Sequence, residues 1–305
     1  MTMLVATQNG TALRRAAVRA TLAPSVHNTQ PWRLHLRSGR LDVLADRRRQ
    51  LPVLDPTARQ MTVSLGCALF NARVSMAGDG IGVDVRRYPD PTQPDLLVSL
   101  RPSGATADAV LATLGPLLEL RQTNRRRFAD AAVPPPVIES LEAAAAAEDA
   151  ALHVVRDPDQ RAAVARLSQH ADDIENLNPA YRAELRAWTT DDPTRRDGVP
   201  GLAVPHVDGS ARRQCLLLLC TDADIPAAWL RAGEALERVL LEITRHGFAA
   251  SPLTPVIEVP SARAQLRREL GLIGCPHVLL RVGRAPATPA SRRRRLVDVL
   301  IEETA

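Results

Sequence analysis

The feature that most restricts the fold is an antiparallel hairpin with helical sequence on both sides. In residues 32–46, WRLHLRSGRLDVLAD, apolar and polar residues alternate, the Ser-Gly pair at 38–39 provides a tight turn, and the alternation then resumes. An apolar stripe with helical spacing precedes the hairpin at 9–22, and a longer one follows it within 55–80. Antiparallel strands placed between helices argue against a doubly wound parallel sheet, so we predict an α+β fold.

Helices and short strands continue in irregular order over the 305 residues. We expect further strands at 82–88, 96–100, 151–155, 215–222 and 277–283, and further helices at 107–120, 137–150, 158–174, 226–247 and 260–270. A chain of this length is typical of about two domains or one large integrated unit. Both halves contain similar helix and strand blocks, although their residues are too dissimilar to show a duplication.

The basic residues are all arginines. There is no lysine among the 39 basic residues, and 34 acidic residues leave a formal net charge of +5. A bias in genomic base composition explains the arginines, and so does anion binding, because a guanidinium group matches phosphate geometry. The net charge is modest, and three tryptophans, two tyrosines and three phenylalanines provide few platforms for base stacking. We therefore predict no nucleic-acid partner.

The stretch APSVHNTQPWRL, at 23–34, is too polar for a core and too rich in proline for a helix. Its hydrogen-bonding side chains are Ser25, His27, Asn28, Thr29 and Gln30. One interpretation is a connector whose polar residues form ordinary turn bonds. The other is a loop that holds a planar heteroaromatic ring edged with carbonyl and N–H groups. The residues alone leave both interpretations open.

Two arginine clusters are candidates for anion binding. RQTNRRRF, at 121–128, presents guanidinium groups and a hydroxyl that could hold a phosphate, although cations are also favoured at the end of a helix for electrostatic reasons. RRRR, at 292–295, is either a solvated basic tail or a second phosphate contact. Together the two clusters could hold one phosphate from opposite sides.

A long segment with little periodicity runs from residue 175 to residue 208 and includes Tyr181 and Trp188. Such a segment is either a lid over a binding site or an insertion that packs on the surface. We expect a lid, and the alternative stays open on the residues alone.

Several common motifs are absent from the sequence. It contains no GxGxxG, P-loop, GxSxG or HExxH motif, and its seven histidines are scattered. The four cysteines lack zinc spacing and are expected to be buried and reduced. No apolar run is long enough to span a membrane, and the N-terminus lacks a secretory pattern. We predict no metal, no catalytic acid–base side chain, no membrane partner and a cytoplasmic location.

The motifs quoted above carry a family resemblance. APSVHNTQPWRL resembles the APS-x-x-N-x-QPW loop of nitroreductase-like flavoproteins, and His before the Asn with Thr after it is similar to the Acg-type subgroup. RQTNRRRF is similar to the family's Arg-x-Ser/Thr-x-Arg motif. Residues 229–254 resemble the helix and turn near the flavin, and residues 275–285 resemble the final strand before the basic tail. The resemblance covers nearly the whole chain.

The resemblance implies an α+β nitroreductase-like fold in which two related halves of one chain imitate the family's homodimer. The implied halves are residues 1–118, with the loop, and residues 119–305, with the phosphate arginines and a lid at 175–208. Only one copy of the loop is present, so one FMN per chain is implied. The oligomeric state stays open, with a homodimer of the fused chain as one option.

Roles for individual residues follow from the resemblance, position by position. Contacts to the isoalloxazine ring and support of its loop are implied for Pro24, Ser25, Asn28, His27 and Gln30. Binding of the phosphate and ribityl chain is implied for Arg121, Thr123, Arg125, Arg293 and Arg294. Backbone groups near the reactive edge of the ring are implied at Pro252, Leu253 and Thr254. Arg295 stands where the subgroup has Pro, which leaves open which of the arginines at 292–295 face phosphate.

Two functions follow from this resemblance. The first is an FMN-dependent oxidoreductase that uses NAD(P)H to reduce nitroaromatic or quinone-type acceptors. Because FMN itself supplies the hydride chemistry, this function needs no acid–base side chain. The second is an FMN-binding protein that sequesters or senses flavin under the lid, with little or no turnover.

Overall fold

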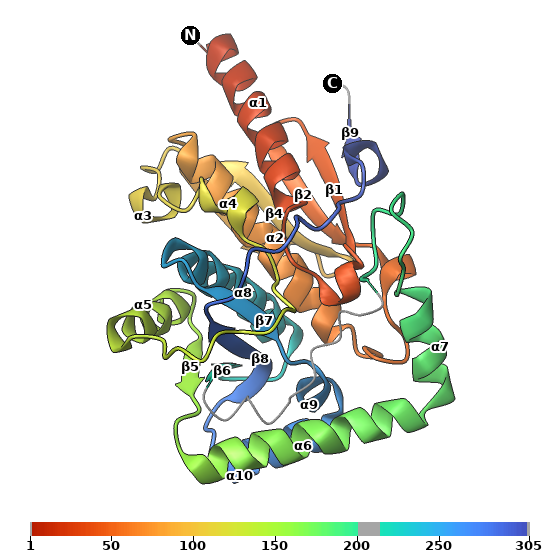
Figure 1. Ribbon diagram of the computed structural model, residues 1–305. Helices are drawn as coiled ribbons and strands as arrows, with labels where there is room; N and C mark the ends of the chain where they lie inside the picture. The colour runs from red at the N-terminus through yellow and green to blue at the C-terminus, as the bar shows by residue number, and fades with distance from the viewer. Residues whose placement is uncertain (1, 201–213, 304–305) are drawn as a thin grey trace.

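The computed structural model describes residues 2–200 and 214–303, and it contains two β-sheets with a pair of long helices between them (Figure 1). The first sheet has the order β3-β4-β2-β1-β9. Its strands are β1 (Trp32–Arg37), β2 (Arg40–Ala45), β3 (Val83–Arg87), β4 (Leu96–Pro102) and β9 (Leu300–Glu302). The hairpin predicted from the alternating sequence is the antiparallel pair of β1 and β2, with Arg37 opposite Arg40 beside the turn.

The second sheet has the order β5-β6-β8-β7. Its strands are β5 (Ala151–Val154), β6 (Cys215–Thr221), β7 (Ala249–Pro252) and β8 (Cys275–Gly283). All neighbouring pairs in this sheet are antiparallel. No strand was predicted at β7, which has four residues and includes a serine and a proline.

The two sheets repeat one topology, which confirms the prediction of two related halves. The order β3-β4-β2-β1 in the first sheet corresponds to β7-β8-β6-β5 in the second, with a long helix between the second and third strands of each unit. The residues are too dissimilar to show this duplication, but the order of the strands does. The boundary between residues 118 and 119 stays a prediction, because β9 at the end of the chain pairs in parallel with β1 in the first sheet.

The two long helices, α2 (Arg59–Gly78) and α8 (Pro226–Arg245), cross at a pair of glycines. A Cβ atom on Gly66 would lie 2.1 Å from the carbonyl oxygen of Leu230, and one on Gly233 would lie 2.0 Å from the carbonyl oxygen of Val63. Any side chain at either position would therefore push the helices apart. This contact joins the halves, and the main apolar core extends across it.

The other helices pack beside α2 and α8, against the second sheet or onto one another. They are α1 (Thr2–Ala20), α3 (Ala109–Ala112), α4 (Leu117–Leu120), α5 (Pro135–Ala146), α6 (Pro158–Leu177), α7 (Pro179–Ala187), α9 (Pro255–Glu258) and α10 (Pro260–Glu269). Short 3-10 helices occur at η1 (Val26–Asn28), η2 (Arg47–Arg49) and η4 (Leu296–Asp298). Among the described residues, no helix combines the length and the hydrophobicity needed to cross a membrane.

Two expectations about helices were wrong in detail. The single helix expected at 107–120 consists of α3 and α4, because Gly115 and Pro116 interrupt the helical pattern. The segment 175–208 is more regular than its sequence indicated, since it contains the end of α6 and all of α7. Asn178 separates these two helices and caps α7 by accepting hydrogen bonds from the backbone of Ala180 and Tyr181. Residues 201–208 of the expected lid lie outside the described residues.

Candidate functional site

The loop between α1 and β1 has a backbone that ordinary connectors avoid. His27, Asn28 and Gln30 have φ angles of 45°, 53° and 50°, a region that residues other than glycine seldom adopt. The hydroxyl of Ser25 accepts a hydrogen bond from the backbone N–H of Gln30 at 2.9 Å and holds the loop closed. Such conformations persist where the surroundings impose them, and they concentrate at functional sites. This favours the interpretation of the loop as part of a binding site.

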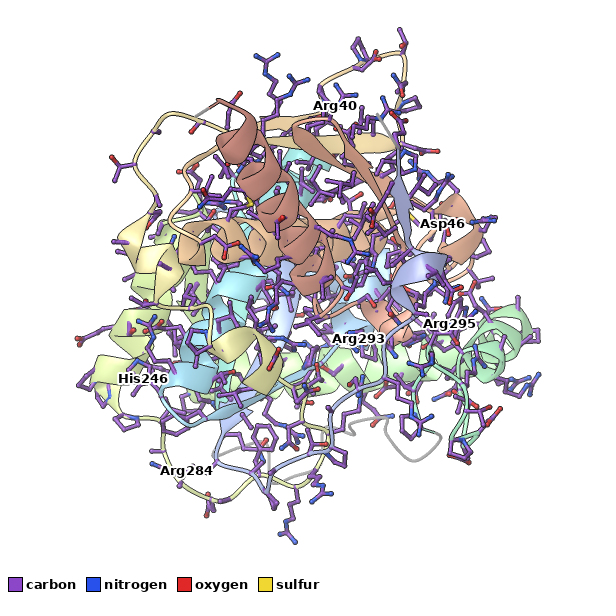
Figure 2. The ribbon with its side chains drawn as sticks, turned by 90° about the horizontal axis from the view of Figure 1, so that it is seen from above. Arg40, Asp46, His246, Arg284, Arg293 and Arg295 are labelled. Carbon is purple, nitrogen blue, oxygen red and sulfur yellow. The ribbon has the colours of Figure 1, made fainter. Side chains whose placement is uncertain are left out.

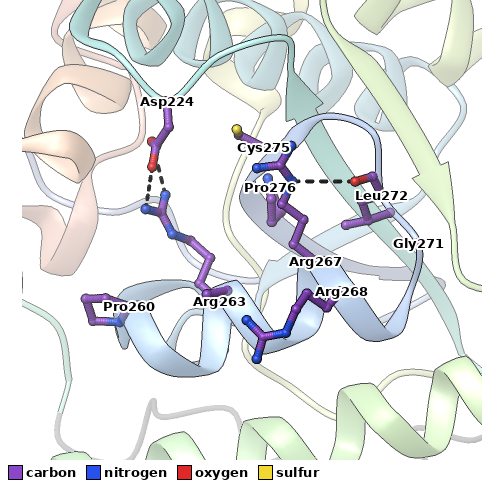
Figure 3. A pocket seen from close by; sticks show the side chains of 10 residues that line it. Asp224, Pro260, Arg263, Arg267, Arg268, Gly271, Leu272, Cys275 and Pro276 are labelled. Carbon is purple, nitrogen blue, oxygen red and sulfur yellow. Dashed lines mark hydrogen bonds and ion pairs between the residues drawn. The ribbon is translucent and has the colours of Figure 1, made fainter.

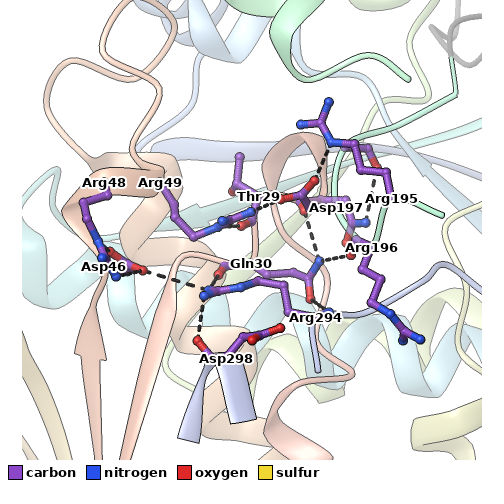
Figure 4. Close-up of polar contacts among 12 residues, drawn as sticks. Thr29, Gln30, Asp46, Arg48, Arg49, Arg195, Arg196, Asp197, Arg294 and Asp298 are labelled. Atoms are coloured by element: carbon purple, nitrogen blue, oxygen red, sulfur yellow. Dashed lines mark hydrogen bonds and ion pairs between the residues drawn. The ribbon is translucent and has the colours of Figure 1, made fainter. Parts of the chain in front are cut away.

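Gln30 connects the loop to two distant parts of the chain (Figure 4). Its side-chain N–H donates to the carbonyl of Arg196 at 2.8 Å, and its side-chain oxygen accepts from the backbone N–H of Arg294 at 2.7 Å. The side chain is fully buried. It therefore fixes both the segment after α7 and the C-terminal tail against the loop.

Asn28 also bonds both to the segment after α7 and to the C-terminal tail. Its side-chain N–H group donates to the carbonyls of Gly198 and Arg292, each at 3.2 Å. Its side-chain oxygen accepts from Arg293 Nη1 at 3.0 Å. The loop, residues 196–198 and the tail consequently form one hydrogen-bonded unit.

Ion pairs also hold the segment that follows α7. The carboxylate of Asp197 pairs with Arg49 and, at 2.6 Å, with Arg195 (Figure 4). Both guanidinium groups also lie over the ring of Trp188, at 5.1 and 5.7 Å from its centre. We call this group of Arg49, Trp188, Arg195 and Asp197 the latch.

Two arginines from separate clusters meet next to the loop. Arg121 Nη2 donates to the carbonyl of Leu22 at 3.1 Å, and Arg293 Nη2 donates to the same oxygen at 3.0 Å. Arg293 extends from the tail toward the end of α1 (Figure 2). Arg121 is only 2% exposed, and its Nε lies 3.2 Å from the carboxylate of Glu237, which is 0% exposed.

This arginine pair has unused hydrogen-bonding capacity. Arg121 Nη1 and Arg293 Nε are buried and have no hydrogen-bond partner among the described residues. Burial, and after it the charge of Arg121, lowers the pKa of Arg293 to about 9. Buried donors that lack partners are costly, so two cations brought together in this way favour an anionic ligand.

Arg125 lies close enough to His27 in the loop for its charge to affect that side chain. No hydrogen bond or ion pair to the described residues engages the guanidinium group of Arg125, which is half-buried. Burial, and after it the charge of Arg125, lowers the pKa of His27 to about 4. His27 is therefore neutral at pH 7, and Arg125 remains available to a ligand.

Residues 121–125 also run along the edge of the second sheet. Thr123 bridges to Ala250 in parallel, and the backbone N–H of Asn124 donates to the carbonyl of Ala250 at 2.9 Å. Pro252 ends β7, Leu253 follows with its N–H bonded to the carbonyl of Leu279 at 2.8 Å, and Thr254 precedes α9. The predicted phosphate-binding segment at 121–125 is therefore hydrogen-bonded to β7, the strand that leads into the predicted turn at 252–254.

One predicted phosphate residue has other partners. Arg294 donates to the carbonyls of Gln30 and Asp298, at 3.3 and 2.7 Å (Figure 4). These bonds fix the tail in front of β9, and a phosphate contact by Arg294 stays a prediction. Arg292 and Arg295 are exposed, whereas Arg293 and Arg294 are half-buried.

A pocket of about 460 Å³ lies elsewhere, between α10 and the start of β8 (Figure 3). Two of its three arginines already have partners in the fold. Arg263 forms a two-pronged contact with Asp224 at 2.6 and 3.2 Å, and Arg267 donates to the carbonyl of Ile273 at 2.8 Å. None of the predicted site residues lines this pocket.

Glu237 and Arg49 are the residues of this region that the sequence did not predict, whereas Trp188, Arg195 and Asp197 lie within the predicted lid segment. Glu237 had a detectable signal, because its spacing from Leu230 and Leu241 places a carboxylate on the buried stripe of α8. Arg49 had none, since it is an ordinary charged residue far from the lid segment in the sequence.

These features define the class of the protein: an α+β protein built from two related halves, with a pair of arginines beside a strained polar loop. In the part of the chain that the structure describes, no group of three or more histidine, cysteine or acidic side chains could hold a metal ion.

Relatives with similar sequences are known from Mycobacterium tuberculosis. The protein named "Putative NAD(P)H nitroreductase Rv3131" is 32% identical over 94% of this chain and 90% of its own length. The one named "Putative NAD(P)H nitroreductase acg" is 31% identical over 94% of both chains. A third, named "Uncharacterized protein Rv3127", is 32% identical over 95% of this chain and 92% of its own.

Solved structures with a similar fold include the FMN-dependent nitroreductase NfnB from Mycobacterium smegmatis in complex with NADPH. It has a TM-score of 0.43 and 19% identity, and the match covers 62% of this chain and 97% of that one. A nitroreductase with bound FMN from Bacteroides fragilis has a TM-score of 0.41 and 13% identity, over 60% of this chain and 94% of that one. No protein-family model matches the chain.

The chain belongs to the Acg-type family of nitroreductase-like proteins, because the relatives named above exceed 30% identity over nearly their full lengths. This confirms the resemblance seen in the sequence and the α+β nitroreductase-like fold predicted from it.

Proposed function

We propose that the protein binds one FMN per chain and uses NAD(P)H to reduce nitroaromatic or quinone-type acceptors. The observation that carries the proposal is the pair Arg121 and Arg293, which share the carbonyl of Leu22. Arg121 Nη1 and Arg293 Nε are buried atoms without a hydrogen-bond partner among the described residues. A phosphate would supply the missing acceptors and compensate two adjacent positive charges. The names of the relatives, which describe NAD(P)H nitroreductases, support the activity.

In this proposal the residues around the pair bind the rest of the cofactor. Arg125 and Thr123 hold the ribityl chain, and Pro24, Ser25 and Asn28 contact the isoalloxazine ring. His27 and Gln30 keep the loop in its strained form, and Arg294 fixes the tail. Pro252, Leu253 and Thr254 lie at the reactive edge of the ring. FMN supplies the hydride-transfer chemistry when it is bound, so the chain needs only to orient it and to exclude water.

Substitution of Arg293 by Gln tests the phosphate assignment. The apoprotein is titrated with FMN and, separately, with riboflavin, which lacks the phosphate. Loss of a charge-assisted contact costs about 1.5–3 kcal/mol, so the variant should bind FMN roughly 10–150-fold more weakly. Riboflavin affinity should change little. Arg292→Gln is the matched control, because its side chain is exposed. Equal losses for FMN and riboflavin would contradict the assignment.

The hydrogen bonds that residues 196–198 make to the loop favour a second candidate, a flavin-storing or flavin-sensing protein. Asn28 and Gln30 hold that segment against the loop, and a closed lid would keep nicotinamide away from the ring. Anaerobic mixing of the FMN-loaded protein with NADPH, and then with NADH, distinguishes the two. Bleaching of the flavin absorption within seconds supports the reductase. Persistent absorption, with bleaching after deletion of residues 180–200, supports storage or sensing.

The location of the protein forms part of the proposal. All four cysteines are free and three of them are buried, which supports a reducing compartment. We propose the cytoplasm. Recovery of the tagged protein with cytoplasmic markers in cell fractionation would support this, and recovery with the envelope would oppose it.

A further inference from the structure

Glu237 lies directly behind the proposed phosphate site. It comes from α8, it is 0% exposed, and Arg121 is its only ion-pair partner among the described residues, at 3.2 Å. Arg121 uses Nε for Glu237 and Nη2 for the carbonyl of Leu22, which leaves Nη1 for a ligand. The carboxylate and a bound phosphate would therefore share one guanidinium group.

Few other charged groups face this carboxylate. Arg121 approaches from the segment after α4 and Arg293 from the tail, while α2 contributes the neutral Asn71 and the thiol of Cys67. Burial raises the pKa of Cys67 well above its usual value, so the thiol carries no charge. The other buried carboxylate of α8, Glu234, is paired with Arg73 and Arg87 in a separate cluster.

While Glu237 is ionised, the charges of this group cannot balance a doubly charged phosphate. Two guanidinium groups and one carboxylate leave a single positive charge, whereas a phosphate brings up to two negative charges. A buried carboxylate near another anion disfavours its own ionised form. Burial already raises the pKa of Glu237 to about 7, against the effect of Arg121, so protonation is accessible near neutral pH.

We propose that binding of the FMN phosphate at Arg121 and Arg293 is coupled to uptake of one proton by Glu237. This inference rests on the proposed function, since it takes FMN as the ligand. A proton from solvent adds to the carboxylate and forms a neutral carboxylic acid. Arg121 and Arg293 are then left to balance the phosphate. Glu237 is thus a positioning residue that sets the pH range in which the cofactor is held.

The test compares the wild type with Glu237→Gln, which is permanently neutral and can still accept from Arg121 Nε. FMN affinity is measured by flavin fluorescence between pH 6 and pH 9. The two proteins should bind equally well at pH 6. At pH 8.5 the variant should bind about tenfold more tightly, because only the wild type must take up a proton. The phosphate's own ionisation, near pH 6, is common to both proteins and cancels in the ratio.

Two controls isolate the effect. Riboflavin has no phosphate, so the ratio of the two proteins' affinities for it should not change with pH. Glu242→Gln removes another carboxylate of α8, one that contacts Ser140 rather than the arginine pair, and should follow the wild type at every pH. A ratio for FMN that is constant with pH, or a variant that binds more weakly throughout, would overturn the coupling and leave Glu237 with a purely orienting role.

Calorimetry of the wild type provides an independent measurement should Glu237→Gln fail to fold. FMN binding at pH 8 is measured in buffers with different ionisation enthalpies, and the dependence gives the number of protons taken up. We expect roughly 0.5–1 proton per FMN; no uptake would overturn the inference. A folded wild type that binds no FMN at any pH would instead refute the proposed function, so the two failures are distinguishable.

Discussion

Arg121 and Arg293 show how single residues define this site. Each comes from an arginine-rich stretch for which the sequence left open both phosphate binding and solvated charge, and each donates to the carbonyl of Leu22 just after α1. Their neighbours at 126, 127, 292 and 295 are exposed. Within each cluster, burial distinguishes the arginines of the site from those that only contribute charge.

A buried histidine provides a prediction about stability. His277 is 0% exposed and bonds to the hydroxyl of Thr221 at 2.6 Å. Burial, assisted by Arg59, lowers its pKa from 6.5 to about 4. The unfolded chain therefore binds more protons in this range, and the free energy of unfolding should fall as pH drops from 6.5 to 4. The contribution of this residue is about 3 kcal/mol.

Urea unfolding of the wild type and of His277→Gln at pH 7 and pH 5 measures this contribution. Glu237, whose pKa is raised to about 7, changes stability in the opposite direction over the same range, so only the difference between the two proteins is informative. The variant should lose less stability than the wild type on acidification. Parallel losses would show that His277 does not contribute.

At the scale of elements, the contact between α2 and α8 determines whether the halves can pack. Gly233→Ala would place a Cβ atom 2.0 Å from the carbonyl oxygen of Val63. Because backbone must move on both helices, we expect a loss of at least about 2–3 kcal/mol in the free energy of unfolding. Gly10→Ala in α1 is the control, since nothing lies within 4 Å of its Cβ position. It should be neutral or stabilising by up to about 1 kcal/mol.

The latch provides a prediction about ligand exchange. Asp197→Asn removes the ion pairs with Arg49 and Arg195 that hold residues 196–198 on the loop. Partly exposed pairs contribute about 0.2–1 kcal/mol each, so loss of both pairs should accelerate FMN release roughly 2–30-fold. Stopped-flow fluorescence after mixing with a flavin-binding competitor measures the rate. Glu139→Gln, an exposed carboxylate on α5, should leave it unchanged. An unchanged rate for Asp197→Asn would indicate that the latch does not limit exchange.

At the scale of the whole molecule, the halves are interlocked. The main core spans both long helices, and β9 returns from the end of the chain to extend the first sheet. We therefore expect a single unfolding transition that coincides for circular dichroism and tryptophan fluorescence. A fragment of residues 1–118 should not fold alone, because it lacks α8 and β9. Two separate transitions, or a folded fragment, would contradict this.

The local chemistry of the chain was readable from the sequence. The alternation of apolar and polar residues from Trp32 to Leu36 predicted the hairpin. The apolar stripe on 226–247 predicted α8 closely. The polar loop at 23–30 was identified by composition alone. The mixed order of helices and strands also predicted the α+β class. These signals are local, because they depend on spacing along one segment and on which side of it is apolar.

The tertiary structure decided what no single segment encodes. The repeated strand order emerges only when distant strands pair, and the Gly66–Gly233 crossing needs both helices in place. Arg121 and Arg293 are 172 positions apart in the numbering, yet they reach one carbonyl oxygen because α1 ends beside the returning tail. Sequence therefore determined the elements and the types of group available, while packing determined which charges are buried together, because desolvation depends on neighbours in space rather than in the chain.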